Sequence, residues 1–436
     1  MARYIVAGSQ PLEGSTKLPG AKNAVTKLLI AALLSDETTT LHNYPEILEI
    51  DLTIRLLRSF GAKIEKMGHG SLTIQRGSDF TNHIPAEEAS HNRMAVLTIA
   101  PLLHCFKEVS LPKNMGGDKI GPRPIDFHLQ AYKNFGATIE EDEQSYHFIC
   151  DRLRGTTIEL PYPSVSTTEN ILLAACLSKG TTVLKNAAVE PEVLDLMLFL
   201  QKMGAIIDIQ TDRSIVIEGV KKLNGTEHRV LPDRIVCASY GALAIASGGR
   251  IEVKDARQDH MLSFLNNLRR MNAPYEIKPD GIVFGDGKKN ILKPLSLETH
   301  VHPGFMTDWQ PPMVILMTQA EGLSVLHETV YQNRLSYTKT LMEMGAHIEN
   351  NTRCLGGIPC RFAHQDFEHS CIVRGITQLK GIKMDVPDLR AGFSYLIAAL
   401  CAEGPSEINH AEEIERGYGN LDTVLKSLGA PIKRVD

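Results

Sequence analysis

The sequence predicts an α/β protein with two domains, each built from three copies of one α/β unit. Two patterns that alternate along the chain indicate the repeat. The length of 436 residues also exceeds the size at which a single hydrophobic core stops growing. Three units can bury their apolar helices together, so two domains of three units are the economical packing. A cleft is expected between the domains.

The first pattern is an amphipathic helix that ends in Gly-Ala and continues into a short strand, as in LLRSFGAKIE and AYKNFGATIE. Glycine, or asparagine in one copy, stands where the C-cap of a helix requires left-handed backbone. The spacing therefore predicts six helix ends of one type. They lie at Gly61, Gly136, Gly204, Asn272, Gly345 and Gly429.

The second pattern is an apolar helix, a small polar turn and a strand, and its copies alternate with the first. A helix that is apolar almost all round has to be buried. Each unit is therefore expected to hold one amphipathic and one buried helix. The copies read AALLSDETTTLHN, APLLHCFKEVSLP, AACLSKGTTVLKN, AIASGGRIEVKD, LMTQAEGLSVLHE and AALCAEGPSEINH. The polar, turn-rich residues 219–232 are the best candidate for the boundary between domains.

The composition is that of a globular protein, with 43% hydrophobic and 22% charged residues. A net charge of -5 gives no reason to expect nucleic acid or an anionic membrane as a partner of the whole surface. No signal peptide or membrane span is recognisable. The eight cysteines are scattered, without a Cys-x-x-Cys pair. They predict reduced thiols in the cytosol, and neither a disulfide framework nor a metal site.

The residues that start the buried helices are candidates for binding an anion, because helix N-termini present unpaired N–H groups. Capping alone would account for Ser164, Asp308 and Asp388. It does not account for the cations, which oppose the helix dipole and therefore indicate a bound anion. The charged or hydroxyl residues at these starts are Lys22, Arg93, Ser164, Asp233 with Arg234, Asp308, and Asp388 with Arg390.

The segment Lys113–Leu129 contains three glycines and two prolines between an expected strand and an expected helix. Such a loop is either a plain connector or a mobile lid that closes on a substrate. As a lid, residues 113–125 would bring Asp118 and Arg123 to the cleft.

With these residues in view, the chain resembles the UDP-N-acetylglucosamine enolpyruvyl transferases from end to end. The resemblance implies a two-domain inside-out α/β barrel, in which the buried helices lie inside the sheets. It also implies that the N-terminal strand crosses over, so that the domains are 22–231 and 1–21 with 232–436. The motifs are GAKNAVTKLL, GGDKIGPRPID, LPYPSVSTTEN, NAAVEPEVLDL, LPDRI, PGFMTDWQ, NRLSYTKTLMEMGA, PDLRAGF and IERGY.

The implied reaction moves the enolpyruvyl group of phosphoenolpyruvate to the 3-hydroxyl of UDP-N-acetylglucosamine and releases phosphate, at the start of peptidoglycan synthesis. Addition and elimination through a tetrahedral intermediate need an acid, a base and cations that hold a phosphate beside a carboxylate. No cofactor is needed. The expected partners are the two small substrates, and the chain is expected to be a monomer or a weak homo-oligomer.

Site residues follow from the matching motifs. The catalytic set is Asp118 as acid and Asp308 as base, with Lys22, Arg390 and Arg416. Phosphoenolpyruvate would be held by Lys22, Asn23, Arg123, Arg334, Arg390 and Arg416. UDP-N-acetylglucosamine would be held by Arg93, Arg123, Pro124, Ile125, Asp126, Phe127, Tyr162, Pro163, Ser164, Val165, Asp308 and Val330.

Asp118 stands where the family usually has cysteine. An aspartate has a reference pKa of about 3.9, so as an acid it would need a pKa raised by desolvation or by the charge of the substrate. The antibiotic fosfomycin alkylates the family's cysteine, so this chain is expected to resist it. Tyr162, Val189 and Val236 also depart from the usual residues, on the side of the sugar nucleotide.

These departures keep a different nucleotide acceptor as the main alternative. An enzyme that acts on shikimate 3-phosphate would share the fold, but not the GGDKIGPRPID or PSVSTTEN motifs. An RNA 3'-phosphate cyclase also repeats an α/β unit, but it would need a basic RNA-binding face. A non-catalytic sugar-nucleotide binding protein is disfavoured by the retained Lys22, Asp308, Arg334, Arg390 and Arg416.

Overall fold

The chain forms two compact units, each with its own hydrophobic core. The computed structural model describes residues 2–8, 10–91, 93–117, 124–386 and 389–436, without the side chains at 389 and 390. Leaving residues 118–122 aside, unit 1 is Met1–Leu18 with Pro232–Asp436, and unit 2 is Pro19–Gly117 with Arg123–Leu231.

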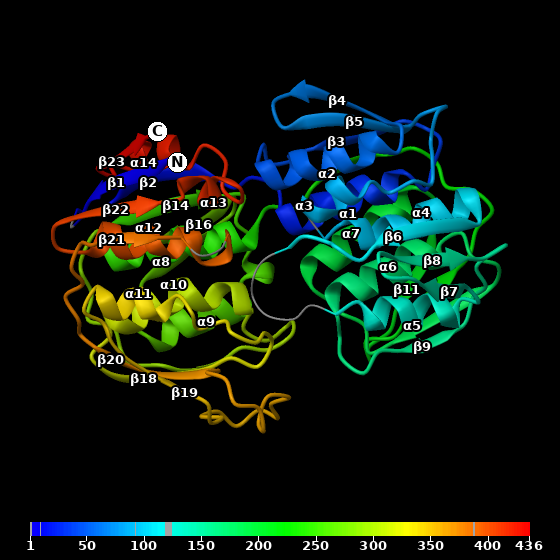
Figure 1. Cartoon of the computed structure of the whole chain (residues 1–436). Coiled ribbons are helices and arrows are strands. Elements are labelled where there is room, and N and C mark those ends of the chain that lie inside the picture. Colours follow the sequence, from blue (N-terminus) through cyan, green and yellow to red (C-terminus); the bar gives the residue numbers. More distant parts are fainter. Residues whose placement is uncertain (1, 9, 92, 118–123, 387–388) are drawn as a thin grey trace. The chain divides into compact units, whose positions relative to one another are not determined.

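Among the described residues of unit 2, three sheets surround a layer of buried helices (Figure 1). The first has the order β13 (Glu227–Arg229), β3 (Thr39–His42), β5 (Ser71–Arg76), β4 (Ala62–Gly68). The second is β6 (Glu108–Pro112), β8 (Ser145–Ile149), β7 (Thr138–Glu141). The third is β11 (Ile206–Ile209), β12 (Ile215–Glu218), β10 (Thr181–Lys185), β9 (Thr157–Glu159).

The buried helices of unit 2 are those that the apolar pattern predicted. They are α1 (Lys22–Ala32), α4 (Ala95–Phe106) and α6 (Val165–Ala175). Helix α4 contacts both others, and the three pack on β5, β6 and β10 respectively. The remaining helices are α2 (Leu48–Ser59), α3 (Ala86–His91), α5 (Asp126–Asn134) and α7 (Pro191–Lys202).

Unit 1 repeats this plan, and the N-terminal strands are part of it. One sheet has the order β21 (Lys383–Asp385), β22 (Pro405–Asn409), β1 (Arg3–Ala7), β23 (Ile432–Val435). Another is β15 (Tyr275–Lys278), β16 (Gly281–Phe284), β14 (Arg250–Lys254), β2 (Glu13–Lys17). A further sheet is β17 (Ser296–Glu298), β18 (Gly322–His327), β20 (Ser370–Gly375), β19 (His347–Asn351). Strand β1, at the blue end of the chain, is antiparallel to the red-to-orange β22 and β23 (Figure 1).

At the centre of unit 1, α8 (Arg234–Ser247), α10 (Gln310–Thr318) and α12 (Leu389–Cys401) contact one another. Helix α8 packs on β14, α10 on β20, and α12 on β1 and β22, so the helices are inside and the sheets outside. This confirms the predicted inside-out α/β architecture. The other helices are η1 (Gln258–His260), α9 (Leu262–Arg270), η2 (Thr307–Trp309), α11 (Thr338–Glu343), α13 (Ala411–Glu415) and α14 (Leu421–Ser427).

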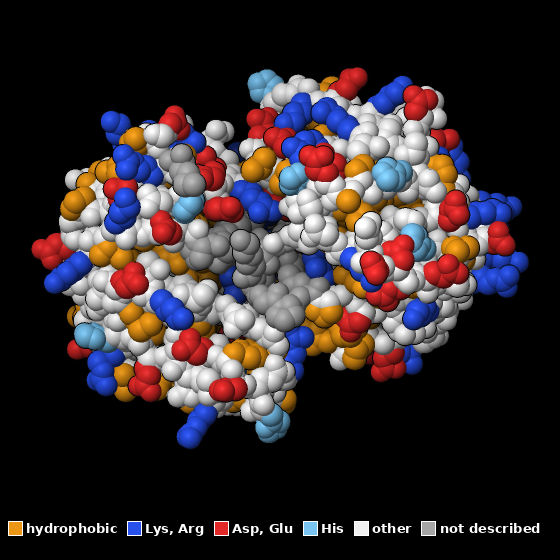
Figure 2. Space-filling view, in the orientation of Figure 1, with side chains coloured by type: hydrophobic (Ala, Val, Ile, Leu, Met, Phe, Trp, Pro, Cys, Tyr) orange, Lys and Arg blue, Asp and Glu red, His pale blue; other side chains and the backbone are white. Residues whose placement is uncertain are grey.

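The charge distribution and the hydrophobicity of the helices relate to two further expectations from the sequence. On the face shown in Figure 2, Lys and Arg side chains are interspersed with Asp and Glu rather than gathered in one field. Among the described residues, no helix combines the length and the apolar character needed to cross a membrane.

The six predicted helix ends all have left-handed backbone. The φ angles are 91° at Gly61, 93° at Gly136, 104° at Gly204, 60° at Asn272, 97° at Gly345 and 87° at Gly429. A side chain in this region clashes with its own backbone, at a cost of about 1–2 kcal/mol. The glycine or asparagine of the repeat therefore marks the residue at which each outer helix ends.

Gly136 and Gly61 give a matched test of this explanation. A Cβ at Gly136 would meet no atom within 4 Å, whereas a Cβ at Gly61 would lie 2.6 Å from the carbonyl oxygen of Asp79. We expect Gly136→Ala to lower the free energy of unfolding by about 1–2 kcal/mol, and Gly61→Ala to lower it by more, because steric overlap is added. Urea titration followed by circular dichroism measures both. Equal losses in the two variants would contradict the explanation.

Candidate functional site

In unit 2, the start of α1 carries a buried cation. Lys22 is the first residue of the helix and is 8% exposed. The N-cap, Ala21, has no side chain that could accept a hydrogen bond from the helix N–H groups. A lysine here opposes the helix dipole, whereas an anion would be stabilised both by the lysine and by the N–H groups. The local chemistry therefore suits a phosphate or a carboxylate.

The start of α6 is built differently, because Ser164 caps it. The Ser164 hydroxyl accepts a hydrogen bond from the Thr167 N–H, with Oγ and N 3.4 Å apart. The capping role expected of Ser164 is therefore confirmed. Pro163 and Tyr162 precede the cap, and Val165 is the first helical residue, so this predicted segment lies at one helix end.

Arg93 and the start of α5 lie together. The Arg93 guanidinium donates a hydrogen bond to the carbonyl oxygen of Pro124, 3.0 Å away. Ile125 is the buried N-cap of α5, and Asp126 and Phe127 form its first turn. Two segments that the sequence predicted to contact the sugar nucleotide are thus joined, although 31 positions separate Arg93 from Pro124.

A buried polar network, which the sequence analysis did not single out, holds α4, α5 and α6 together. Asn170 of α6 donates to the carbonyl oxygen of Val96, at 3.2 Å, and lies 3.0 Å from Nδ1 of His128. An amide nitrogen only donates, so Nδ1 accepts and Nε2–H donates to the Ser166 hydroxyl at 3.2 Å. Burial, reinforced by the charge of Arg93, lowers the pKa of His128 to about 3. His128 is therefore a neutral structural group at pH 7.

Next to Asn170, Glu169 is fully buried in the same apolar helix. Among the described residues, neither of its carboxyl oxygens has a hydrogen-bond partner. The Nζ of Lys27 is 3.8 Å from Oε2 of Glu169 but donates to the carbonyl oxygen of Asn23 at 2.7 Å. Burial raises the pKa of Glu169 to about 7, and Lys27 offsets this only in part.

In unit 1, Asp308 and Arg334 form a buried ion pair with 3.1 Å between Oδ1 and Nη2. They are 5% and 2% exposed. Losing one partner of such a pair leaves an uncompensated charge, which costs about 3–5 kcal/mol. Asp308 belongs to η2, and the N-cap of α10 is Trp309. The alternative that Asp308 serves as a helix cap is therefore wrong, because its carboxylate faces Arg334 instead.

Glu328 positions the turn that leads to Arg334. Its carboxylate accepts hydrogen bonds from Thr307 and Gln310, at 2.8 Å and 2.6 Å, beside the start of α10. It also accepts from the backbone N–H groups of Val330 and Tyr331, at 2.7 Å and 2.9 Å. One buried carboxylate thus joins the Asp308 segment to the turn that contains Val330. The sequence analysis had not identified this residue.

The start of α8 lies against the same group. Asp233 caps the helix by accepting from the N–H groups of Ile235 and Val236, at 2.8 Å and 3.1 Å. The carbonyl oxygen of Arg234 accepts a hydrogen bond from the Trp309 indole. The guanidinium of Arg234 lies 5.3 Å from the centre of the Trp309 ring. The starts of α8 and α10 are therefore packed together.

Of the other predicted site residues, Arg416 is described by the structure and three residues are not, in whole or in part. Arg416 is the C-cap of α13, with its guanidinium 4.0 Å from the Glu413 carboxylate. Asp118 and Arg123 lie outside the described residues, as does the side chain of Arg390. Lys22 and Ser164 lie at the starts of buried helices. Arg93 instead contacts the segment before α5, and Arg416 lies at the end of α13.

Comparisons with known proteins agree with this architecture. The family model described as EPSP synthase (3-phosphoshikimate 1-carboxyvinyltransferase) matches residues 6–425. The UDP-N-acetylglucosamine 1-carboxyvinyltransferase of Protochlamydia amoebophila (strain UWE25) is 46% identical, over 99% of this chain and 94% of the relative. That of Chlamydia pneumoniae is 43% identical over the same shares. The chain belongs to the UDP-N-acetylglucosamine 1-carboxyvinyltransferase group of the EPSP synthase family.

Solved structures confirm the fold of this family. The enolpyruvyl transferase NikO from Streptomyces tendae superposes with a TM-score of 0.88 at 20% identity, over 100% of this chain and 99% of that chain. EPSP synthase from Acinetobacter baumannii gives 0.76 at 18% identity, over the whole of both chains. At these identities, the likeness concerns the fold alone.

The buried carboxyl of Glu169 predicts a pH dependence of stability. A folded-state pKa of about 7 lies above the ordinary value of 4.5, so the folded state keeps the proton that the unfolded state loses. This contribution is complete below about pH 4.5 and is lost as the pH rises to 7. We expect the unfolding free energy of the wild type to fall, relative to Glu169→Gln, between pH 5 and pH 7.

Urea titrations at pH 5, 6, 7 and 8 measure this difference. The control variant is Glu159→Gln, which removes an exposed carboxyl on β9 of the same unit. A difference between wild type and Glu169→Gln that stays constant from pH 5 to pH 8 would show that Glu169 is ionised in the folded state.

Proposed function

We propose that this protein transfers the enolpyruvyl group of phosphoenolpyruvate to the 3-hydroxyl of UDP-N-acetylglucosamine and releases phosphate. The observation that carries the proposal is the 46% identity, over 99% of the chain, to a UDP-N-acetylglucosamine 1-carboxyvinyltransferase. The reaction would serve peptidoglycan synthesis. All eight cysteines are free, which supports a reducing cytoplasmic location.

In unit 1, we assign the proton-accepting role to Asp308. A base must be oriented toward the hydroxyl that it deprotonates, and the Arg334 guanidinium holds one carboxylate oxygen of Asp308 in place at 3.1 Å. As the hydroxyl oxygen attacks C2 of phosphoenolpyruvate, its proton passes to the carboxylate. Arg334, Arg390 and Arg416 supply positive charge for the phosphate and the carboxylate of the substrate.

In unit 2, Lys22 and Asn23 at the start of α1 take the phosphoenolpyruvate side of the site, together with Arg123. The N–H groups of that helix end add to the charge of Lys22. Arg93 with residues 124–127, and residues 162–165, bind the sugar nucleotide. The Asn170 and His128 network supports these segments without a charged group of its own, because burial keeps His128 neutral.

Asp118 is the proposed acid that protonates the methylene carbon of phosphoenolpyruvate. Transfer of this proton makes the methyl group of the tetrahedral intermediate. The elimination that follows takes a proton back from that methyl group as phosphate leaves. The carboxyl has to be protonated at the moment of addition, so its pKa must be raised by desolvation or by the anionic substrate.

One assay distinguishes the acceptors. Phosphate release from phosphoenolpyruvate is measured with UDP-N-acetylglucosamine, with shikimate 3-phosphate and with UMP. We expect release only with the first. Release with UMP alone would instead indicate the paralogous activity on another nucleotide, for which the departures at Tyr162, Val189 and Val236 left room.

Replacing the proposed acid tests the mechanism. We expect Asp118→Ala to abolish turnover while leaving the binding of UDP-N-acetylglucosamine intact, because the loss affects proton transfer and not the sugar site. Phosphate release and isothermal titration calorimetry measure the two properties. Full activity of Asp118→Ala would remove Asp118 from the mechanism.

The same position predicts the response to fosfomycin. A carboxylate is a far poorer nucleophile toward the epoxide than a thiolate, so the wild type should resist the drug. We expect Asp118→Cys to be inactivated with the drug attached to the new thiol, as intact-mass spectrometry would show. Inhibition of the wild type by stoichiometric fosfomycin would contradict this prediction.

A further inference from the structure

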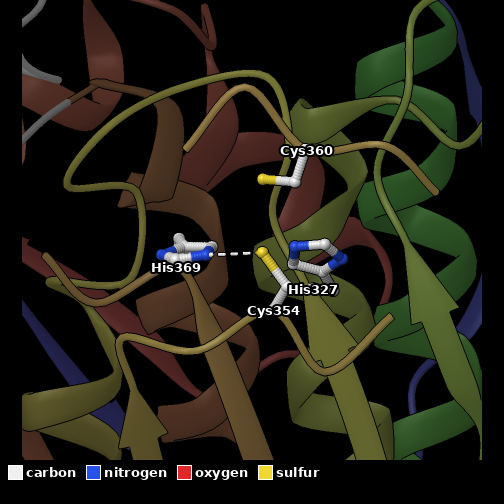
Figure 3. Close-up of side chains that lie close together, drawn as sticks. All are labelled: His327, Cys354, Cys360 and His369. Carbon is white, nitrogen blue, oxygen red and sulfur yellow. Dashed lines mark hydrogen bonds between the residues drawn. The ribbon is translucent and has the colours of Figure 1, made fainter. Parts of the chain in front are cut away.

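Two cysteines and two histidines of unit 1 meet at one end of the β17–β18–β20–β19 sheet. His327 is the last residue of β18, and His369 directly precedes β20. Cys354 and Cys360 lie on the segment between β19 and β20. One ligand atom from each residue lies within 4.8 Å of the others. Figure 3 shows the four side chains directed toward a shared space. The sequence analysis expected no metal site and had not singled out these four residues.

The hydrogen bonds of the two imidazoles direct their lone pairs toward this space. Nδ1 of His327 is 3.0 Å from Oε2 of Glu298, and Nδ1 of His369 is 2.9 Å from the carbonyl oxygen of Phe367. Both partners are acceptors, so both Nδ1 atoms carry the hydrogen. Each Nε2 then keeps its lone pair, which is the arrangement that a metal-binding histidine requires.

The Nε2 atoms support this assignment. Among the described residues, Nε2 of His327 is buried and has no hydrogen-bond partner. A buried polar atom without a partner costs about 1–3 kcal/mol. Nε2 of His369 lies 3.4 Å from Sγ of Cys354, the contact drawn as a dashed line in Figure 3. A purely structural role would therefore leave Nε2 of His327 unsatisfied.

Glu298 forms an outer layer around the cluster. Both carboxylate oxygens of Glu298 accept backbone hydrogen bonds, from the N–H groups of Gly357 and Ile358. Oε2 is also 3.0 Å from Nδ1 of His327, so Glu298 accepts the Nδ1–H of that imidazole. Carboxylates in this position orient metal-binding imidazoles and increase their basicity.

The Cys354–Cys360 segment is fitted closely to these groups. The backbone N–H groups of Gly357 and Ile358 donate to the two oxygens of Glu298, at 2.8 Å and 3.0 Å. A Cβ at Gly356 would lie 2.0 Å from Oε2 of Glu298 and 2.4 Å from Nδ1 of His327. The Phe362 N–H is 3.4 Å from Sγ of Cys360, a weak hydrogen bond that would stabilise a thiolate.

We propose that His327, Cys354, Cys360 and His369 bind one Zn²⁺ ion. Two thiolates and two imidazoles are a tetrahedral donor set that zinc prefers, and four protein ligands make a closed, structural site rather than a catalytic one. Bonds of about 2.3 Å to sulfur and 2.0 Å to nitrogen set ligand atoms roughly 3.3–3.8 Å apart. The Nε2 to Sγ distance of 3.4 Å between His369 and Cys354 already fits.

The ion would stabilise the part of unit 1 that carries Arg334. Arg361, next to Cys360, donates a hydrogen bond to the carbonyl oxygen of Val330. His327 is followed directly by Glu328, whose carboxylate holds the N–H groups of Val330 and Tyr331. Zinc would therefore join the 352–369 segment to the turn that leads to Arg334. The inference does not depend on which acceptor the enzyme uses.

Metal analysis of the full chain tests the proposal. The protein is produced without a polyhistidine tag, purified under reducing conditions and analysed by inductively coupled plasma mass spectrometry. We expect about one zinc per chain in the wild type and close to none in Cys354→Ser/Cys360→Ser. The matched control, Cys105→Ser, removes an exposed thiol of unit 2 and should keep its zinc. Cobalt(II) in place of zinc should give the thiolate charge-transfer and tetrahedral ligand-field bands.

A second variant tests the site without removing a ligand, in case the double cysteine variant does not fold. Glu298→Gln keeps all four ligands and should weaken zinc binding by about 10–100-fold, because the outer-layer carboxylate is lost. A competition titration with a chromogenic chelator measures this change, and chelation should lower the melting temperature of the wild type.

Any one of the following results would overturn the proposal. They are zinc far below one per chain after reconstitution with Zn²⁺, zinc retained in the double cysteine variant, no tetrahedral cobalt spectrum, and a Cys354–Cys360 disulfide in the protein as isolated. Stoichiometric binding of another metal in preference to zinc would also reject the assignment.

Discussion

The structure depends on the burial of helices that are apolar over their whole circumference. Such a helix cannot lie on a surface, so in the described part of each unit three of them lie inside three sheets. The hydrophobic effect, at about 25 cal/mol per Å² of buried apolar area, favours this arrangement strongly. Lys22 on α1 and Ser164 at the start of α6 are predicted site residues that lie at the ends of such helices.

Polar groups that remain inside the units are costly unless they have partners, and most of them do. Asn170 and His128 satisfy each other between helices of unit 2, and Glu328 collects four hydrogen bonds in unit 1. Neither carboxyl oxygen of Glu169 has a hydrogen-bond partner among the described residues, and burial outweighs Lys27 and favours the neutral acid. Each network connects a helix start to a neighbouring segment, so the cores position the binding residues as well as supporting the fold.

The zinc-binding cluster that we infer would also connect neighbouring segments through polar groups, in a region with less apolar packing. The segment between β19 and β20 contains no helix or strand among the described residues, and hydrogen bonds to Glu298 and Val330 attach it to the sheet. A metal ion adds strong bonds where few apolar contacts are available. The metal ion would therefore stabilise the turn at Val330, a few residues before Arg334.

The sequence alone determined the repeat, the buried helices and the stop of each outer helix, because these depend on interactions within about one turn of the chain. It also located Lys22, Ser164 and Asp308 at helix starts. Only the tertiary structure decided that Asp308 pairs with Arg334 and that Glu328 and Asn170 organise their surroundings, since these partners are far apart in sequence. The same holds for His327 and His369 with Cys354 and Cys360. Strand pairing brings them together, and no local spacing could have revealed it.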